Sequence, residues 1–281
     1  MTQLRFQWLG ILFILIAQLL FSTNFSIVTF LSPYFTITQL IFFRSILGPF
    51  LLLPFFLSHK IRLDLSRPWM LVLRSSCGLI AMTCLYAAFR VGDVGNVTLL
   101  FNFSVIWTFI AAFFIFKDRT HRYSLISLFF AFIGLGLVFF PFSVFINMGS
   151  FFALTGSFFA AGVVLSLKSL RSTHDSLSVV FFFQVFSSIA YIGPAQLSIE
   201  FIHSPFFYLL LISGCISFLA QFFLTSGYKH ITASVGAAVS LAQIPLMYIS
   251  GYLFFDQHIT LINMTGVFIV LLSLTIISIF R

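Results

Sequence analysis

The sequence predicts an all-α integral membrane protein whose ten transmembrane helices form two inverted five-helix repeats. The first observation is composition: 60% of the 281 residues are hydrophobic and 7% are charged. A soluble domain would carry charge on about a quarter of its residues, so lipid is the expected solvent for most of this chain. The other two observations are a succession of membrane-length apolar runs and a pair of turns that occurs twice.

Ten apolar runs are long enough to cross a bilayer, since a helix needs about 20 residues to do so. Each is expected to be helical, because backbone polar groups in lipid must be satisfied within the segment. Pro49 and Pro245 fall inside the second and ninth runs, where they are expected to kink or unwind the helix. The expected spans are 8–30, 36–57, 69–89, 94–116, 123–141, 149–167, 177–198, 206–227, 233–255 and 259–280.

Basic residues are distributed unevenly between the two sides of the membrane. With the N-terminus in the cytoplasm, eleven of the fourteen Lys and Arg residues fall on the cytoplasmic side. Only Arg90 falls outside, while Arg44 and Arg74 lie within spans. The positive-inside rule therefore predicts a multi-pass protein of the cell (inner) membrane with both termini in the cytoplasm. It also explains the net charge of +8 without a nucleic-acid surface.

Two pairs of turns give the chain an internal repeat. An aromatic and basic turn at 86–95 is followed by a span and an acidic turn at 116–120, and the same order recurs at 228–234 and 255–260. Because each half holds five spans, an odd number, the second half enters the membrane in the opposite orientation. The expected units are residues 1–144 and 145–281.

Features of both halves resemble the drug/metabolite transporter superfamily, EamA type. They are Arg44, the turn at 86–95 and Asp118 in the first half, and Gln221, the turn at 228–234, Pro245 and Asp256 in the second. The resemblance covers nearly the whole chain. The sequence departs from the family in having Asp where Glu is usual after spans four and nine. It also lacks the usual proline in the middle of span four, where residues 105–107 stand.

The resemblance implies a secondary transporter, not an enzyme, that needs no cofactor. It would work by alternating access around a midplane cavity between spans one, three, four, six, eight and nine. Residues 67–74 resemble a branch of the family that includes S-adenosylmethionine, riboflavin and metallophore carriers. An uptake carrier of the S-adenosylmethionine or riboflavin type therefore stays an alternative. The expected partners are the lipid bilayer and a small-molecule substrate, with no nucleic acid, for a monomer or homodimer.

Charged residues within the spans are the sharpest site candidates. Arg44 lies about eight residues inside span two, where an unpaired cation is costly. It is expected either to bind an anion in a wet cavity or to bond backbone carbonyls of a neighbouring helix. Arg74 lies near the cytoplasmic edge and is expected to extend its side chain there. All six acidic residues fall in predicted loops, which favours facilitated transport or exchange over proton symport. The expected substrate is a small polar metabolite, zwitterionic or anionic, derived from an amino acid or a nucleoside.

Neutral polar residues complete the expected site. Asn102 and Trp107 on span four are near counterparts of Gln243 and Tyr248 on span nine. The expected substrate-binding or gating set is Arg44, Tyr86, Asn102, Trp107, Gln221, Gln243 and Tyr248. For the neutral members, the alternative is interhelical hydrogen bonding within the packed bundle. Structural or topological roles are expected for Arg74, Asp118, Pro245 and Asp256.

A membrane-embedded lipid-modifying enzyme is the alternative from another class. It would need an acid–base pair near an interface, which Asp118 with His121 or Asp256 with His258 could supply. The matched positions of these acids in the two repeats fit helix-end turns better. The six histidines lack metal-ligand spacing, and the chain has no Gly-rich phosphate loop, so neither a metal nor a cofactor is expected.

Overall fold

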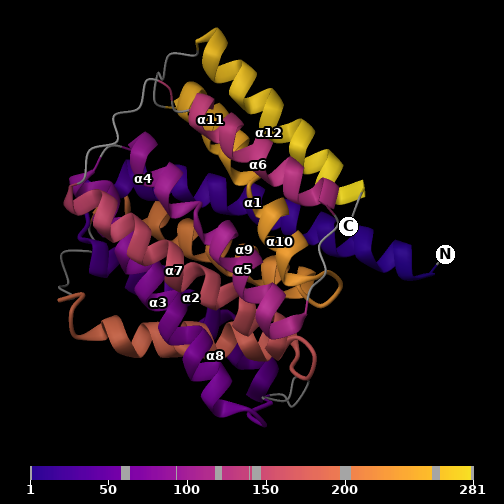
Figure 1. Cartoon of the computed structure of the whole chain (residues 1–281). Coiled ribbons are helices and arrows are strands. Elements are labelled where there is room, and N and C mark those ends of the chain that lie inside the picture. The colour runs from indigo at the N-terminus through magenta and orange to yellow at the C-terminus, as the bar shows by residue number, and fades with distance from the viewer. Residues whose placement is uncertain are drawn as a thin grey trace.

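The structure, a computed structural model, describes residues 2–57, 64–92, 94–117, 122–138, 140, 147–196, 204–254 and 260–279. Within these ranges the chain forms helices and no strand (Figure 1). The helices are α1 (Thr2–Leu31), α2 (Ile37–Leu57), α3 (Pro68–Val91), α4 (Val94–Phe101), α5 (Ser104–Phe116), α6 (Arg122–Val138), α7 (Met148–Leu170), α8 (Ser176–Ile192), α9 (Phe207–Gly227), α10 (Ala233–Ser240), α11 (Gln243–Phe254) and α12 (Leu261–Ile279). The predicted all-α fold class is confirmed.

The helices account for the ten predicted spans. By length and composition, seven helical segments of the described chain could cross a membrane. Three shorter apolar helices, α6, α8 and α12, complete the ten. Two of the spans are each divided into two helices, α4 with α5 and α10 with α11. These are spans four and nine, which occupy the same place in the two repeats.

Both divided spans are interrupted by a short tight turn. Around the first break, the amide of Phe103 donates to the carbonyl of Leu100 at 3.2 Å and that of Val105 to Asn102 at 3.0 Å. Around the second, the amide of Leu241 donates to Ala238 at 3.0 Å. Hydrogen bonds to the third preceding residue are of the 3₁₀ type, which within a helix is a common mark of a hinge. Pro49, by contrast, lies inside an uninterrupted α2.

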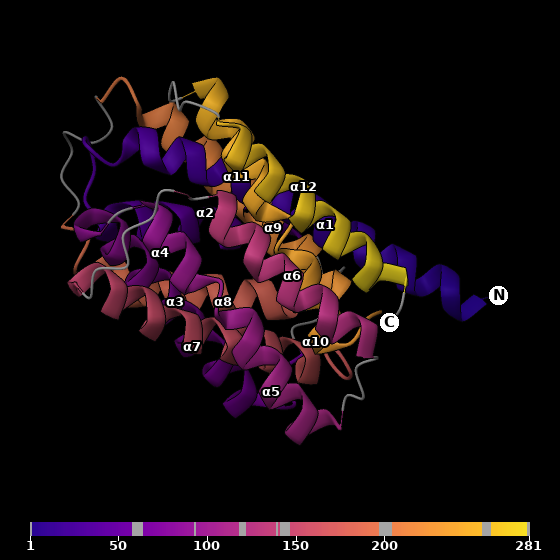
Figure 2. The same cartoon turned by 45° about the horizontal axis from the view of Figure 1, so that its top comes forward.

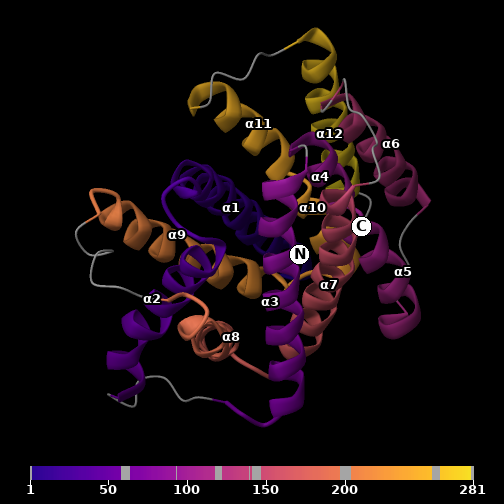
Figure 3. The ribbon, with the colours of Figure 1, turned by 90° about the vertical axis from the view of Figure 1, so that its left-hand side faces the viewer.

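The packing repeats between the two halves. Helix α3 packs along α7, as α9 packs along α1, and α2 packs on α8. Helices α6 and α12 lie side by side at one edge of the bundle (Figure 2). Figure 3 shows α2, α8 and α9 gathered at the other side. The partners in each pairing come from different halves, so the two repeats interlock instead of forming separate bodies.

Glycines permit the closest helix approaches. A Cβ atom on Gly149 of α7 would lie 2.6 Å from the Cα of Gly92, at the end of α3. A Cβ atom on Gly266 of α12 would lie 2.6 Å from the carbonyl oxygen of Gly134 in α6. The Asn263 side chain strengthens the second pair, donating to the carbonyl of Val138 at 2.8 Å. Small residues at contacts of this kind are how membrane helices pack tightly in the absence of a hydrophobic driving force.

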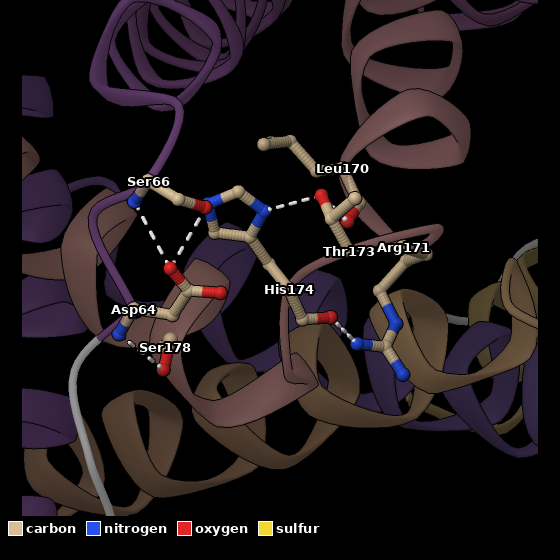
Figure 4. A network of polar contacts seen from close by, with 7 residues as sticks. All are labelled: Asp64, Ser66, Leu170, Arg171, Thr173, His174 and Ser178. Carbon is tan, nitrogen blue, oxygen red and sulfur yellow. Dashed lines mark hydrogen bonds and ion pairs between the residues drawn. The ribbon is translucent and has the colours of Figure 1, made fainter.

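A polar network joins the segment before α3 to the connection between α7 and α8 (Figure 4). The Asp64 carboxylate lies 3.8 Å from Nε2 of His174 and accepts a hydrogen bond from the Ser66 amide at 2.9 Å. The Asp64 amide in turn donates to the Ser178 hydroxyl at 3.4 Å. Asp64 and Ser66 belong to the first half, His174 and Ser178 to the second. The network therefore links the two repeats near the start of α3 and the ends of α7 and α8 that face each other.

Replacing Asp64 by asparagine should weaken this link in a pH-dependent way. The hydrogen bonds from Ser66, with a smaller contribution from His174, hold the pKa of the Asp64 carboxyl below its ordinary value. A depressed carboxyl pKa stabilises the folded state above the ordinary pKa, and this is lost as the pH falls through the depressed value. We expect the Asp64→Asn variant to melt slightly lower than wild type at neutral pH, with the difference shrinking below about pH 4 and vanishing below the depressed pKa of Asp64.

Asp175→Asn is the matched control, since this exposed side chain makes no capping hydrogen bond to α8. Melting temperatures of the purified proteins across this pH range give the comparison. A deficit of Asp64→Asn that is the same at every pH would contradict an electrostatic origin.

Candidate functional site

A cavity of about 250 Å³ lies in the middle of the bundle. Its lining comes from α1, α3, α4, α5, α7, α9, α10 and α11, with Arg44 added from α2 and Phe183 from α8. Apart from α2 and α8, these lining helices form spans one, three, four, six, eight and nine, between which the cavity was expected. Both interrupted spans contribute lining residues next to their breaks, Asn102 at the first and Gln243 at the second. The breaks therefore face the cavity.

Most of the cavity wall is apolar, with a few polar side chains at defined places. Gln18 of α1 donates to the Ser240 hydroxyl of α10 at 3.1 Å, and both residues line the cavity. Asn24, one turn and a half further along α1, donates to the Ser213 carbonyl of α9 at 2.6 Å. Such a wall, apolar with few fixed polar groups, is typical of small-molecule sites.

Arg44 projects from α2 toward the cavity and is held by side chains of two other helices. Its Nε donates to the hydroxyl of Ser217 in α9, and its Nη1 donates to the hydroxyl of Tyr86 in α3 at 3.1 Å. The guanidinium also lies 5.8 Å from the ring centroid of Phe21. The position of Arg44 is compatible with both expected roles, anion binding and helix packing, since it lines the cavity and bonds to two neighbouring helices. Its partners are hydroxyl groups instead of backbone carbonyls.

Arg74 differs from its expected position. Its side chain does not extend to the membrane edge but is 1% exposed and lines the cavity. Nη2 donates to Oε1 of Gln221 at 2.8 Å, and the guanidinium carbon lies 3.8 Å from the ring centroid of Phe183. Helices α7 and α8 pack against α3, and Phe183 of α8 and Gln221 of α9 contact the guanidinium, so neighbouring helices cover this side chain. A glycine one turn later, Gly78, leaves room for the guanidinium.

The other predicted residues divide into two groups. Tyr86, Asn102, Gln221 and Gln243 line the cavity with Arg44. Trp107 and Tyr248 do not. Trp107 is 37% exposed and donates to the Ser157 hydroxyl at 3.1 Å, while Tyr248 is buried in the apolar core between α5, α6, α10 and α12.

Three residues with expected structural or topological roles remain. Pro245 is the third residue of α11, where the first turn of a helix tolerates proline. Asp118 and Asp256 lie outside the described residues, as do the histidines paired with them in the enzyme alternative.

The charge of the cavity is one-sided. Arg44 and Arg74 both line it, and none of the lining residues in the described chain is Asp or Glu. No cluster of metal-ligating side chains occurs among the described residues either. The site can therefore offer cationic and neutral hydrogen-bond donors together with aromatic surface. Sequence reasoning did not assign Arg74 and Phe183 to it, although the Arg-x-x-x-Gly spacing of Arg74 and Gly78 was a readable signal.

An all-α membrane protein of two inverted repeats, with broken helices around a central cavity, has the architecture of a secondary transporter. The chain matches the EamA-like transporter family twice, over residues 8–140 and 147–279. It belongs to that family and is a transporter, not an enzyme.

Two similar proteins agree with this membership. The chain is 25% identical over 255 residues to a pseudopaline exporter, CntI, of Pseudomonas aeruginosa, with 88% of each chain covered. It is 26% identical over 280 residues to an uncharacterized transporter of Helicobacter pylori, covering 94% of this chain and 92% of that one. A solved crystal structure with 13% identity superposes with a TM-score of 0.78 over 97% of this chain, which supports the fold.

Proposed function

We propose that this transporter moves a small anionic or zwitterionic metabolite across the inner membrane by alternating access, with both of its termini in the cytoplasm. The observation that carries the proposal is the cavity with two arginines and no lining carboxylate in the described chain. Fixed cations in a low-dielectric cleft raise the local concentration of anions and disfavour cations. The substrate therefore needs at least one negative group.

Size and lining narrow the substrate further. A cavity of about 250 Å³ lies just below the range typical for drug-sized ligands, so an amino acid- or nucleoside-derived metabolite fits it better than a lipid. The name of the Pseudomonas relative, a pseudopaline exporter, supports a metabolite as cargo and export as direction. The S-adenosylmethionine alternative is less favoured, because its sulfonium would add a third positive charge to the cavity.

The packing of the interrupted spans supports a state open to the outside. Helix α5 packs against α10, whereas α4 and α11 have no comparable contact among the described residues. In the proposed orientation, α5 and α10 are the cytoplasmic halves of their spans and α4 and α11 the outer halves. Contact between one pair of halves and separation of the other would close the cavity to the cytoplasm. The tight turns between the halves would act as hinges.

Counterflow in proteoliposomes tests the proposal. Liposomes loaded with one unlabelled compound from a panel of amino acids, nucleosides and their acidic derivatives should accumulate the same compound in labelled form. An anion or zwitterion should do so without a change of internal pH, because none of the described residues that line the cavity is a carboxylate that could carry a proton. Liposomes with the double variant Arg44→Gln/Arg74→Gln serve as the control and should show no counterflow. Activity restricted to S-adenosylmethionine or other cations would refute the charge assignment, and no activity with the entire panel would refute the carrier.

A further inference from the structure

The two cavity arginines differ in what they have free to offer a ligand. We propose that Arg74 is the receptor for a carboxylate group of the transported metabolite, while Arg44 holds helices together beside it. The proposal rests on the proposed function and deepens it, because it assigns the negative group of the substrate to one side chain. It also makes Arg74 a determinant of specificity.

Arg74 keeps unused hydrogen-bond donors inside the protein. A guanidinium has five N–H groups, of which Nε and Nη1 carry three. Neither of these two nitrogens has a protein hydrogen-bond partner, although the side chain is only 1% exposed. Buried donors are nearly always satisfied, and an unsatisfied charged donor is costly. An anionic ligand in the cavity would satisfy them.

The guanidinium of Arg74 is also fixed in place before any ligand arrives. Gln221 accepts from Nη2 on one side at 2.8 Å, and the Phe183 ring lies 3.8 Å beneath the guanidinium carbon. At Gly78, an added Cβ atom would lie 3.1 Å from Nη1 and 2.9 Å from the Phe183 ring. Glycine at this position therefore leaves room for the guanidinium, which a larger residue would crowd. A donor group held in this way loses little entropy when a ligand binds.

Arg44 is more fully engaged by the protein. Its Nε and Nη1 already donate to Ser217 and Tyr86, which belong to different helices, whereas the same two nitrogens of Arg74 have no protein partner. Its positive charge still acts through the cavity, since like charges facing one space are relieved by an anion between them. Directional bonding to the ligand, however, falls to Arg74.

A carboxylate is the group that this receptor fits best. A planar guanidinium pairs with planar carboxylates through parallel N–H···O hydrogen bonds, which are stronger than neutral ones. One face of the Arg74 guanidinium is covered by the Phe183 ring, so the ligand must approach in the guanidinium plane or from the other face. The apolar wall near Arg74 suits a singly charged group better than a phosphate dianion.

Acetate is the probe that tests the assignment on the purified full-length protein in detergent. Thermal stabilisation is measured against rising sodium acetate, with sodium chloride at equal ionic strength and neutral acetamide as references. Acetate should stabilise wild type and acetamide should not, since a ligand that binds only the folded state raises its stability. In Arg74→Gln the apparent affinity should fall about tenfold or more, as expected for loss of a charged hydrogen-bond donor.

Two further variants keep the result interpretable. Arg74→Lys retains the charge without the planar donors and should also bind acetate more weakly than wild type, which matters if Arg74→Gln does not fold. Arg122→Gln, at an exposed arginine at the start of α6, should respond to acetate as wild type does.

Three outcomes would overturn the assignment: equal acetate responses in wild type and both Arg74 variants, no acetate-specific response in wild type, or a stronger response to inorganic phosphate. Counterflow without acetate binding would remove the Arg74 site and leave the carrier. Acetate binding without counterflow would leave the anion site at Arg74 and remove the carrier.

Discussion

Alanine at Gly149 is expected to lower the free energy of unfolding by about 1–3 kcal/mol, the usual cost of inserting atoms into a packed interior. The new Cβ atom would lie 2.6 Å from the Cα and 2.9 Å from the amide nitrogen of Gly92, both backbone atoms. Backbone cannot turn aside as a flexible side chain does, so α3 and α7 would have to separate. Thermal melting of the purified protein, read as the loss of helical circular dichroism, measures the effect.

Gly193→Ala is the matched control. This glycine follows α8, and an added Cβ atom there would meet nothing within 4 Å. Its melting temperature should equal that of wild type. Equal melting of Gly149→Ala and Gly193→Ala would show that the α3–α7 contact is looser than the structure has it.

A cysteine at Phe21 should react with a charged, membrane-impermeant thiol reagent added from the outside. Phe21 lines the cavity, which in the proposed orientation is closed by α5 and α10 on the cytoplasmic side. A cysteine at Leu19 should stay unreacted, because that side chain lies on the same helix but is 52% exposed on the surface that would face lipid. Thiolates react and thiols in hydrocarbon do not ionise, so the reagent distinguishes water from lipid.

The experiment needs a background without Cys77, Cys84 and Cys215, each replaced by serine. Labelling of intact cells followed by mass spectrometry gives the readout. If Phe21→Cys reacts only when the cytoplasmic side is exposed, either the orientation or the outward-open state is wrong. Labelling of Leu19→Cys to the same extent would show that the reagent does not discriminate.

The arrangement of the spans could be predicted from the sequence because the bilayer imposes simple rules. Hydrocarbon thickness sets the length of each run. The direction that the positive-inside rule gives each span stays a prediction. The interruption of span four could not be predicted, since no proline marks it. It depends on how α5 packs against α7 and α10, contacts that join distant parts of the chain.

The site was predicted in part, for reasons that the geometry makes plain. Asn102 and Gln243 lie beside the two breaks and line the cavity. Trp107 and Tyr248 are five residues further along, and in a helix this spacing turns a side chain by about 140° from the first position, away from the cavity. The prediction that the Arg74 side chain extends to the membrane edge was wrong, because it considered only the distance along α3. Whether that edge is reachable depends on the neighbouring helices, which periodicity does not describe.

The α6–α12 pair carries a consequence for the proposed alternating-access cycle. These are equivalent helices of the two repeats. If the two repeats exchange conformations, α6 and α12 exchange places and the contact between them is preserved. The Gly134–Gly266 approach and the Asn263 bond to Val138 can therefore stay intact while other interfaces change. This edge of the bundle is suited to be a stationary pivot. A tight contact there lets the rest of the molecule move without coming apart.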